Sequence, residues 1–231
     1  MKLVFDIETV GEDYNSLDKT TQEVLTHWIK RESYGEEEYN IQLEELKNGL
    51  GFSPLTGQIV AIGVLDVELN KGAVYYQNNG ETNKDFEEED IKFKVMSEKE
   101  MLEKFWEGAK KYHQFITFNG RGFDVPFLVV RSAVHGIRPS VNLMPPRFNM
   151  STNHIDLLDQ LTFYGSVRKK GNLHLWSRAF GIKSPKEMGV TGEDVGRLYR
   201  EGKYLEIAKY NVGDLRATRE LYLNWDKYIR F

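Results

Sequence analysis

Residues 2–9 read KLVFDIET, an apolar run rich in β-forming residues that ends in two acids. The pattern predicts a first, central strand over Lys2 to Ile7. Alternate residues of a strand point to the same face, so Asp6 and Glu8 are expected to project together at its end. Two convergent carboxylates repel each other unless a proton or a cation lies between them, and their hard oxygen atoms suit Mg²⁺ or Mn²⁺. The same two acids are equally compatible with solvated residues at a strand edge.

The chain has 231 residues, of which 40% are hydrophobic and 13% aromatic. That length favours one domain over residues 1–231 with an insertion, rather than two small domains. No run approaches the roughly 18 apolar residues that cross a bilayer, so no membrane partner is expected. The N-terminal residues turn acidic too early for a signal peptide, and we expect a cytoplasmic protein. Zero cysteines exclude disulfides, thiol catalysis and cysteine-ligated metal.

Charge is unevenly distributed along the chain. Residues 1–120 hold 13 Lys and Arg against 24 Asp and Glu, whereas residues 121–178 hold eight against three. Such a chain can present a positive groove, so the overall net charge of −4 does not exclude a nucleic-acid partner. Acidic surface loops in the front half would explain the asymmetry equally well.

The remaining pattern predicts an α/β fold, a mixed sheet flanked by helices. Apolar residues spaced at three, four and seven indicate helices over 15–48, with a second piece at 39–50, and we interpret 11–50 as an acidic helical insertion after the first strand. Ser97 and Glu100 have the spacing of a capping box. Further strands are expected at 58–69, 73–77, 91–95 (an edge strand) and 115–118. A helix opened by Ser97 is expected to carry Met101, Leu102, Phe105 and Trp106 on one side, and further helices are expected at about 123–134, 156–163, 173–180, 192–201 and 204–225.

A second segment with chemical potential is FNGRGFD at residues 118–124. A strand runs there into two glycines, which permit unusual backbone angles and the close approach of a ligand. Asp124 then falls at or near a helix start. An N-cap role would explain this Asp without any metal.

The third segment is YNVGD at residues 210–214. Residues four apart on a helix share a face, so the phenol of Tyr210 and the carboxylate of Asp214 are expected to point the same way. A surface Asp beside a packed Tyr is the alternative interpretation.

Together the three segments resemble the DEDD exonucleases of the DnaQ-like, RNase H-like superfamily, and the Tyr places the chain in the DEDDy branch. They are most similar to the proofreading exonuclease of family B DNA polymerases and its polymerase-free relatives. The similarity rests on FDIET at 5–9, FNGRGFDVPFL at 118–128, and Tyr210 with Asp214. It extends poorly over the insertion at 11–50. The resemblance implies an RNase H-like mixed sheet and a stand-alone nuclease.

The resemblance also implies a role for each acid. Asp6, Glu8 and Asp214 would hold the metal that activates water, and Asp6 would bridge to a second metal. Asp124 would help to hold that second ion. Tyr210 would orient the attacking water or help to take its proton. Two Mg²⁺ or Mn²⁺ ions are therefore the expected cofactors.

Substrate contacts follow from the same resemblance. Asn119 and Phe123 would lie against the terminal nucleotide, with Phe123 as a stacking surface. Thr9 would reach the terminal sugar. Arg121 would pair with a phosphate, although a solvent-facing Arg in a glycine loop is equally compatible.

Two further features keep alternative interpretations. Lys169 is the centre of the RKK triplet at 168–170, which suits a phosphate-binding loop or a solubilising turn. Asp156 is expected to cap the helix that follows it, and a role beside the metal site stays open.

We therefore expect a two-metal 3′-5′ exonuclease that acts on single-stranded DNA or a frayed 3′ end. The choice of DNA over RNA rests on the resemblance alone. The alternatives are a 3′-5′ exoribonuclease of the same fold, a non-catalytic nucleic-acid-binding domain and a structure-specific endonuclease. Retention of all five catalytic-type residues argues against the non-catalytic alternative.

Overall fold

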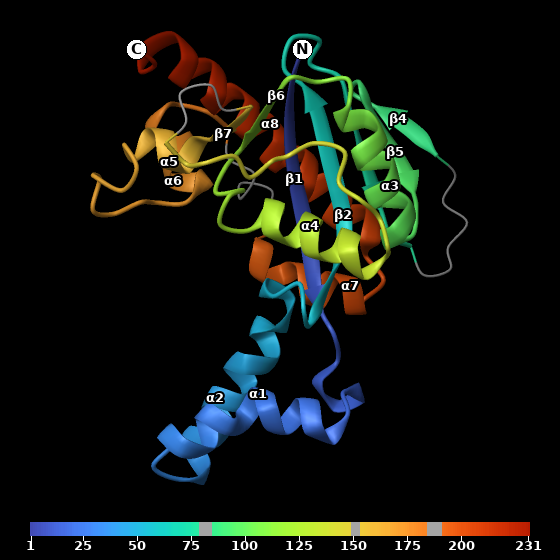
Figure 1. Ribbon diagram of the computed structural model, residues 1–231, viewed down its shortest axis with the longest axis vertical. Helices are drawn as coiled ribbons and strands as arrows, with labels where there is room; N and C mark the ends of the chain where they lie inside the picture. The colour runs from blue at the N-terminus through green and yellow to red at the C-terminus, as the bar shows by residue number, and fades with distance from the viewer. Residues whose placement is uncertain (79–84, 149–152, 184–190) are drawn as a thin grey trace.

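The computed structural model describes residues 1–78, 85–148, 153–183 and 191–231. Within those ranges a mixed seven-stranded sheet has the order β4-β5-β3-β2-β1-β6-β7 (Figure 1). The strands are β1 (Lys2–Gly11), β2 (Gly57–Asp66), β3 (Gly72–Tyr76), β4 (Phe86–Glu88), β5 (Ile91–Val95), β6 (Gln114–Thr117) and β7 (His154–Asp156). Because β1 pairs antiparallel with β2 and parallel with β6, the first strand lies inside the sheet, as predicted.

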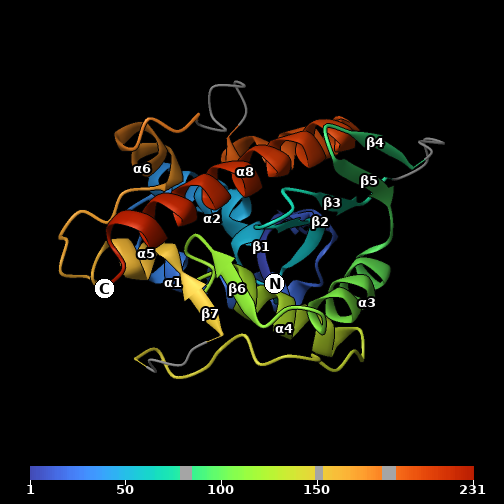
Figure 2. The same ribbon diagram turned by 90° about the horizontal axis from the view of Figure 1, so that it is seen from above.

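Helices cover both faces of this sheet, α8 on one face and α3 with α4 on the other (Figure 2). The helices are α1 (Lys19–Glu32), α2 (Glu36–Gly49), α3 (Glu98–Ala109), α4 (Asp124–Val134), α5 (Leu157–Leu161), α6 (Leu173–Ala179), α7 (Val195–Arg200) and α8 (Tyr204–Tyr228). The predicted capping box of Ser97 and Glu100 opens α3. No helix in the described ranges is long and apolar enough to cross a membrane.

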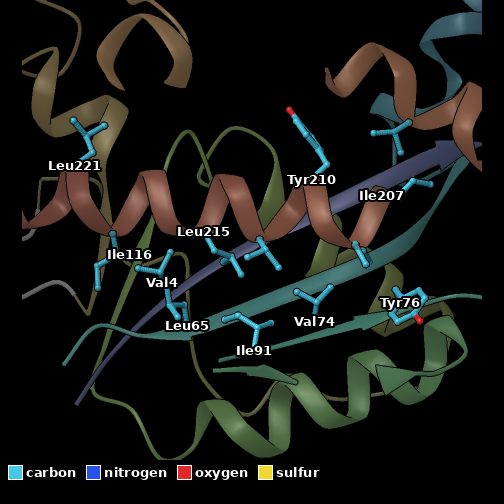
Figure 3. Close-up of a cluster of buried hydrophobic side chains, with 14 of the residues drawn as sticks. Val4, Leu65, Val74, Tyr76, Ile91, Ile116, Ile207, Tyr210, Leu215 and Leu221 are labelled. Carbon is cyan, nitrogen blue, oxygen red and sulfur yellow. The ribbon is translucent and has the colours of Figure 1, made fainter. Parts of the chain in front are cut away.

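The two faces of β1 pack into two different cores. Phe5 belongs to the core beneath α3 and α4, whereas Val4 and Val10 belong to the core beneath α8 (Figure 3). Strand alternation therefore places Asp6 and Glu8 on the α8 face.

The insertion forms a helical hairpin, α1 and α2, that projects from the C-terminal end of β1 (Figure 1). The insertion ends in a short 3₁₀ turn, Leu50–Phe52, which runs to residue 52 rather than to the expected 50 and returns the chain to that strand end. Gly51 and Gly11 lie against each other there, and a Cβ on Gly51 would come within 2.9 Å of the Gly11 amide nitrogen. The helical insertion is thus confirmed, and its return point lies against the strand that carries the acids.

The structure corrects the expected sheet at two places. The strand expected at the edge, β5, is covered by the three-residue β4, in which Phe86 stacks on Phe93 of β5 with ring centroids 4.6 Å apart. Strand β7 was not predicted, because its three residues are specified by pairing with β6 rather than by a local pattern. Residues 154–156 consequently precede α5 as strand.

Candidate active site

Asp6, Glu8 and Asp214 converge between β1 and α8. One carboxylate oxygen from each lies within 4.8 Å of the others, close enough for the three to hold a single metal ion. Asp6 and Glu8 share the face fixed by strand alternation, and Asp214 comes from the helix that covers that face. The structure thus brings the first and third segments together, and their role as metal ligands stays a prediction.

Asn211 lies between the two acids of β1, and the sequence interpretation missed it. Its side chain is fully buried, and its Nδ2 donates to Asp6 Oδ2 at 2.8 Å and to Glu8 Oε1 at 3.4 Å. The signal available beforehand was an Asn in the interior of a core-facing helix, where Asn is disfavoured. Asn211 therefore links the two carboxylates of β1 through one side-chain nitrogen.

Gly63 of β2 makes room for that amide. It pairs with Asp6 in the β1–β2 register. A Cβ at position 63 would lie 1.9 Å from Asn211 Oδ1 and 2.6 Å from Leu215 Cδ1. The absence of a side chain at Gly63 is what lets α8 approach the sheet at the level of the acids.

The surroundings of Asp6 and Glu8 raise the pKa values of both carboxyl groups. Burial raises the pKa of Asp6 well above its ordinary value, and the charges of Asp124, Asp214 and Glu8 raise it further. Burial and the charge of Asp214 raise the pKa of Glu8, against the lowering effect of the Asn211 hydrogen bond. Clustered buried carboxylates of this kind are stabilised by a proton or by a cation, so the donor set fits a divalent metal.

Asp124 is the first residue of α4, the helix on the face of the sheet opposite to α8. The N-cap position is occupied by Phe123, whose side chain makes no capping bond, so the N-cap alternative for Asp124 is wrong. Its Oδ1 instead accepts the N–H of Ile7 at 3.1 Å, and burial is the main cause that raises its pKa to about 7. Asp124 is near enough for its charge to act on Asp6, but it lies outside the 4.8 Å group.

Asp156 accepts hydrogen bonds from the loop that precedes Asp124. Its predicted N-cap role is confirmed by a 3.0 Å bond from the N–H of Leu158. The same carboxylate accepts the N–H groups of Asn119 and Arg121, each at 2.9 Å. One buried side chain therefore holds both the start of α5 and the glycine loop in place.

Tyr210 lies one helical turn before Asp214. Its side chain is buried, and Figure 3 shows the ring leaving α8 in the direction opposite to Leu215. Burial is the main cause that raises the pKa of its phenol, and a hydrogen bond with Asp214 raises it too. The hydroxyl is therefore protonated at neutral pH.

Among the residues expected to contact substrate, some side chains bond within the protein and others are exposed. Thr9 Oγ1 donates to Gly51 O at 2.7 Å, and Arg121 Nη2 donates to Pro145 O at 2.9 Å. Asn119 is exposed with a left-handed φ of 63°. The side chains of Thr9 and Arg121 thus donate to carbonyl groups of the protein itself. The roles of these three residues toward substrate stay predictions.

Phe123 and Lys169 lie in different settings. Phe123 is half-buried, with its ring centroid 5.5 Å from Phe127 and 6.4 Å from Phe52 of the insertion. Lys169 is exposed in the connection between α5 and α6, which projects outward beyond those helices in both views. The phosphate-binding role of the basic triplet stays a prediction.

A family model matches residues 55–229, and its description is a predicted 3′-5′ exonuclease related to the exonuclease domain of PolB. The matched range contains Asp124, Tyr210 and Asp214. Asp6 and Glu8 precede it, on the far side of the insertion.

Individual relatives agree with that family. The chain is 31% identical over 148 residues to a DNA polymerase of Desulfurococcus sp. (strain Tok) and 30% identical over 148 residues to one of Thermococcus gorgonarius. Each match covers 55% of this chain and 18% of the relative, so the chain spans only a small part of these polymerases.

Among solved structures, the family B DNA polymerase of the hyperthermophilic archaeon Pyrobaculum calidifontis superimposes with a TM-score of 0.60 at 16% identity. The superposition covers 97% of this chain and 24% of the polymerase. At that identity the likeness concerns the fold alone, and it confirms the predicted RNase H-like mixed sheet flanked by helices.

Proposed function

Because this chain belongs to the family of predicted 3′-5′ exonucleases related to the exonuclease domain of PolB, we propose that it hydrolyses the terminal phosphodiester bond at the 3′ end of single-stranded DNA. The observation that carries the proposal is the convergence of Asp6, Glu8 and Asp214 within 4.8 Å, beside the buried Tyr210. These residues come from β1 and α8, so the fold itself assembles them.

The acids would hold two divalent ions. Asp6, Glu8 and Asp214 would hold one ion, and Asp6 with Asp124 would hold the second. When bound, Mg²⁺ or Mn²⁺ would stabilise the negative charge that develops on the attacking and leaving oxygens. Burial, and after it the charges of neighbouring acids, raises the pKa values of Asp6 and Glu8, and a bound cation would stabilise their charged forms, which supports this assignment.

The chain's own residues supply positioning. Tyr210 carries a protonated hydroxyl and suits the orientation of an attacking water by hydrogen bonding rather than the removal of its proton. Asn211 holds Asp6 and Glu8 in fixed relative positions. The hydrogen bond from the Ile7 N–H ties Asp124 to the strand that carries the other acids.

Two considerations support the choice of substrate. The relatives at 31% and 30% identity are both DNA polymerases, which favours DNA over RNA. Phe123 lies immediately before Asp124 and offers an aromatic surface to an unpaired base. A single-stranded or frayed end would present such a base without any cost of unpairing.

The test uses 5′-labelled single-stranded DNA, RNA of the same sequence, a 3′-blocked DNA and a circular single-stranded DNA, each with Mg²⁺. A ladder of products shortened from the 3′ end of the linear DNA, with the blocked and circular DNA intact, is the expected result. Faster shortening of the RNA would identify an exoribonuclease, and cleavage of the circle an endonuclease. Binding of the linear DNA without shortening by either Mg²⁺ or Mn²⁺ would favour the non-catalytic binding domain.

A further inference from the structure

An exposed phenylalanine of the insertion lies beside the aromatic residue that precedes Asp124. The side chain of Phe52 is 66% exposed, although Phe is among the residues most often buried. Its ring meets Phe123 edge-on, with centroids 6.4 Å apart and planes inclined at 65°. The pair therefore combines one exposed ring with one half-buried ring that directly precedes Asp124 in the sequence.

The backbone beside Phe52 is fixed to the strand that carries the acids. Gly51 O accepts the hydroxyl of Thr9 at 2.7 Å, and Thr9 follows Glu8 directly. Leu50 is buried, and its carbonyl accepts Thr56 Oγ1 at 2.8 Å. An exposed ring on an anchored backbone keeps its place, which distinguishes Phe52 from an aromatic residue on a free loop.

Phe52 belongs to the segment that closes the insertion and not to the sheet. The chain leaves β1, forms α1 and α2, and returns through the 3₁₀ turn Leu50–Phe52 to the same strand end (Figure 1). Gly51 lies close to Gly11, and a Cβ on Gly51 would come within 2.9 Å of the Gly11 amide nitrogen. There is therefore no space for a side chain at position 51. The return of the insertion thus places its aromatic residue opposite α4.

We propose that Phe52 and Phe123 together form a stacking surface for the base of the 3′-terminal nucleotide, and that one task of the insertion is to supply Phe52 to this surface. The inference rests on the proposed function and names the base-recognition part of the same site. Stacking on an aromatic face tolerates every base but requires the base to be unpaired. The surface would therefore select single-stranded ends without selecting a sequence.

The experiment compares Phe52→Ala, Phe52→Tyr and Tyr34→Ala with the unmodified protein. Tyr34 is a matched control, because it is a fully exposed aromatic residue of the same insertion, between α1 and α2. Each protein is given a DNA oligonucleotide with an ordinary 3′-terminal nucleotide and one whose terminal nucleotide lacks its base. KM and kcat are measured with Mg²⁺, and the dissociation constant of each oligonucleotide is measured in EDTA.

Because Phe52→Ala removes one ring that stacks on the terminal base, it should weaken binding of the ordinary oligonucleotide roughly ten-fold. The weakening should appear both in KM and in the dissociation constant measured in EDTA. The base-less oligonucleotide should bind Phe52→Ala and the unmodified protein equally. Tyr34→Ala should behave like the unmodified protein, and Phe52→Tyr, which keeps an aromatic ring, should restore most of the binding that Phe52→Ala loses. Equal weakening on both oligonucleotides, or no weakening on either, overturns the inference while leaving the exonuclease proposal intact. If no protein shortens DNA, the exonuclease proposal fails, and the binding measurement in EDTA still decides whether Phe52 recognises the base.

Discussion

Asn211 holds Asp6 by a 2.8 Å hydrogen bond from its buried side-chain amide. A longer bond of 3.4 Å from the same nitrogen reaches Glu8, so one amide connects both acids of β1. Its partners are the acids that the proposed mechanism needs, and the relationship gives Asn211 a positioning role that can be tested apart from the fold.

Replacement of Asn211 by Ala should raise the metal concentration needed for half-maximal activity. Residues that orient metal ligands typically contribute about 10- to 100-fold in metal affinity or activity, and a loss in that range is expected. The measurement is the initial rate of DNA shortening as a function of Mg²⁺ concentration. Asn224→Ala is the control, because Asn224 lies on the same helix and donates to Glu220 O instead. An unchanged Mg²⁺ dependence in Asn211→Ala would contradict a positioning role.

Gly63→Ala should destabilise the protein, because the added Cβ would lie 1.9 Å from Asn211 Oδ1. Overpacking of this kind costs about 1–3 kcal/mol, measurable as the free energy of unfolding in urea with EDTA present. Adding Asn211→Ala should recover part of the loss, since Leu215 still crowds position 63. Gly108→Ala in α3, where nothing lies within 4 Å, should instead stabilise by about 0.5–1 kcal/mol. Additive effects of the two substitutions at 63 and 211 would show that these side chains do not meet.

In the metal-free protein, ionisation of Asp124 should lower the free energy of unfolding as the pH rises from about 4 to 7. Burial raises the folded-state pKa of Asp124 to about 7, above the value of about 3.9 expected in the unfolded chain. Between those values the folded state binds more protons, so its stability falls with rising pH, and the effect is complete above about pH 7. Asp124→Asn keeps an oxygen for the Ile7 N–H but cannot ionise.

The measurement for Asp124 is the difference in unfolding free energy between Asp124→Asn and the unmodified protein, in EDTA. Asp124→Asn should gain relative stability when the pH is raised from 5 to 8. A difference that stays constant over this range would mean that Asp124 titrates at its ordinary pKa.

Divalent metal should stabilise the protein through Asp214. A ligand that binds only the folded state at about 100 times its dissociation constant adds about 2.7 kcal/mol, so Mg²⁺ or Mn²⁺ should raise the melting temperature of the unmodified protein. Asp214→Asn should lose most of that rise, because Asp214 belongs to the 4.8 Å group. Asp226→Asn is the matched control, an acid of the same helix that pairs with Arg230. Equal metal-induced rises in the two variants would place the metal elsewhere.

Local patterns were sufficient to predict the parts of the site that depend on one element. Strand alternation placed Asp6 and Glu8 on one face, and helical spacing placed Tyr210 and Asp214 together. The capping box of α3 and the N-cap of α5 at Asp156 followed from the same short-range rules. In each case the neighbours that matter lie within a few residues along the chain.

Features that depend on the crossing of distant elements were not predictable from the same patterns. Asn211 and Gly63 meet only because α8 crosses β2 at the level of Asp6. Phe52 reaches Phe123 only because the insertion returns to the end of β1. Strands β4 and β7 each have three residues and owe their form to pairing with β5 and β6.

The most direct test of the central claim is the shortening of a 5′-labelled single-stranded DNA by the unmodified protein and by Asp6→Ala, with Mg²⁺, with Mn²⁺ and with EDTA. Asp6 is chosen because it belongs to the 4.8 Å group and is the acid proposed to contact both ions. The account predicts a metal-dependent ladder from the 3′ end with the unmodified protein, and none with EDTA or with Asp6→Ala. Shortening by Asp6→Ala at the rate of the unmodified protein, or shortening that persists in EDTA, would contradict it.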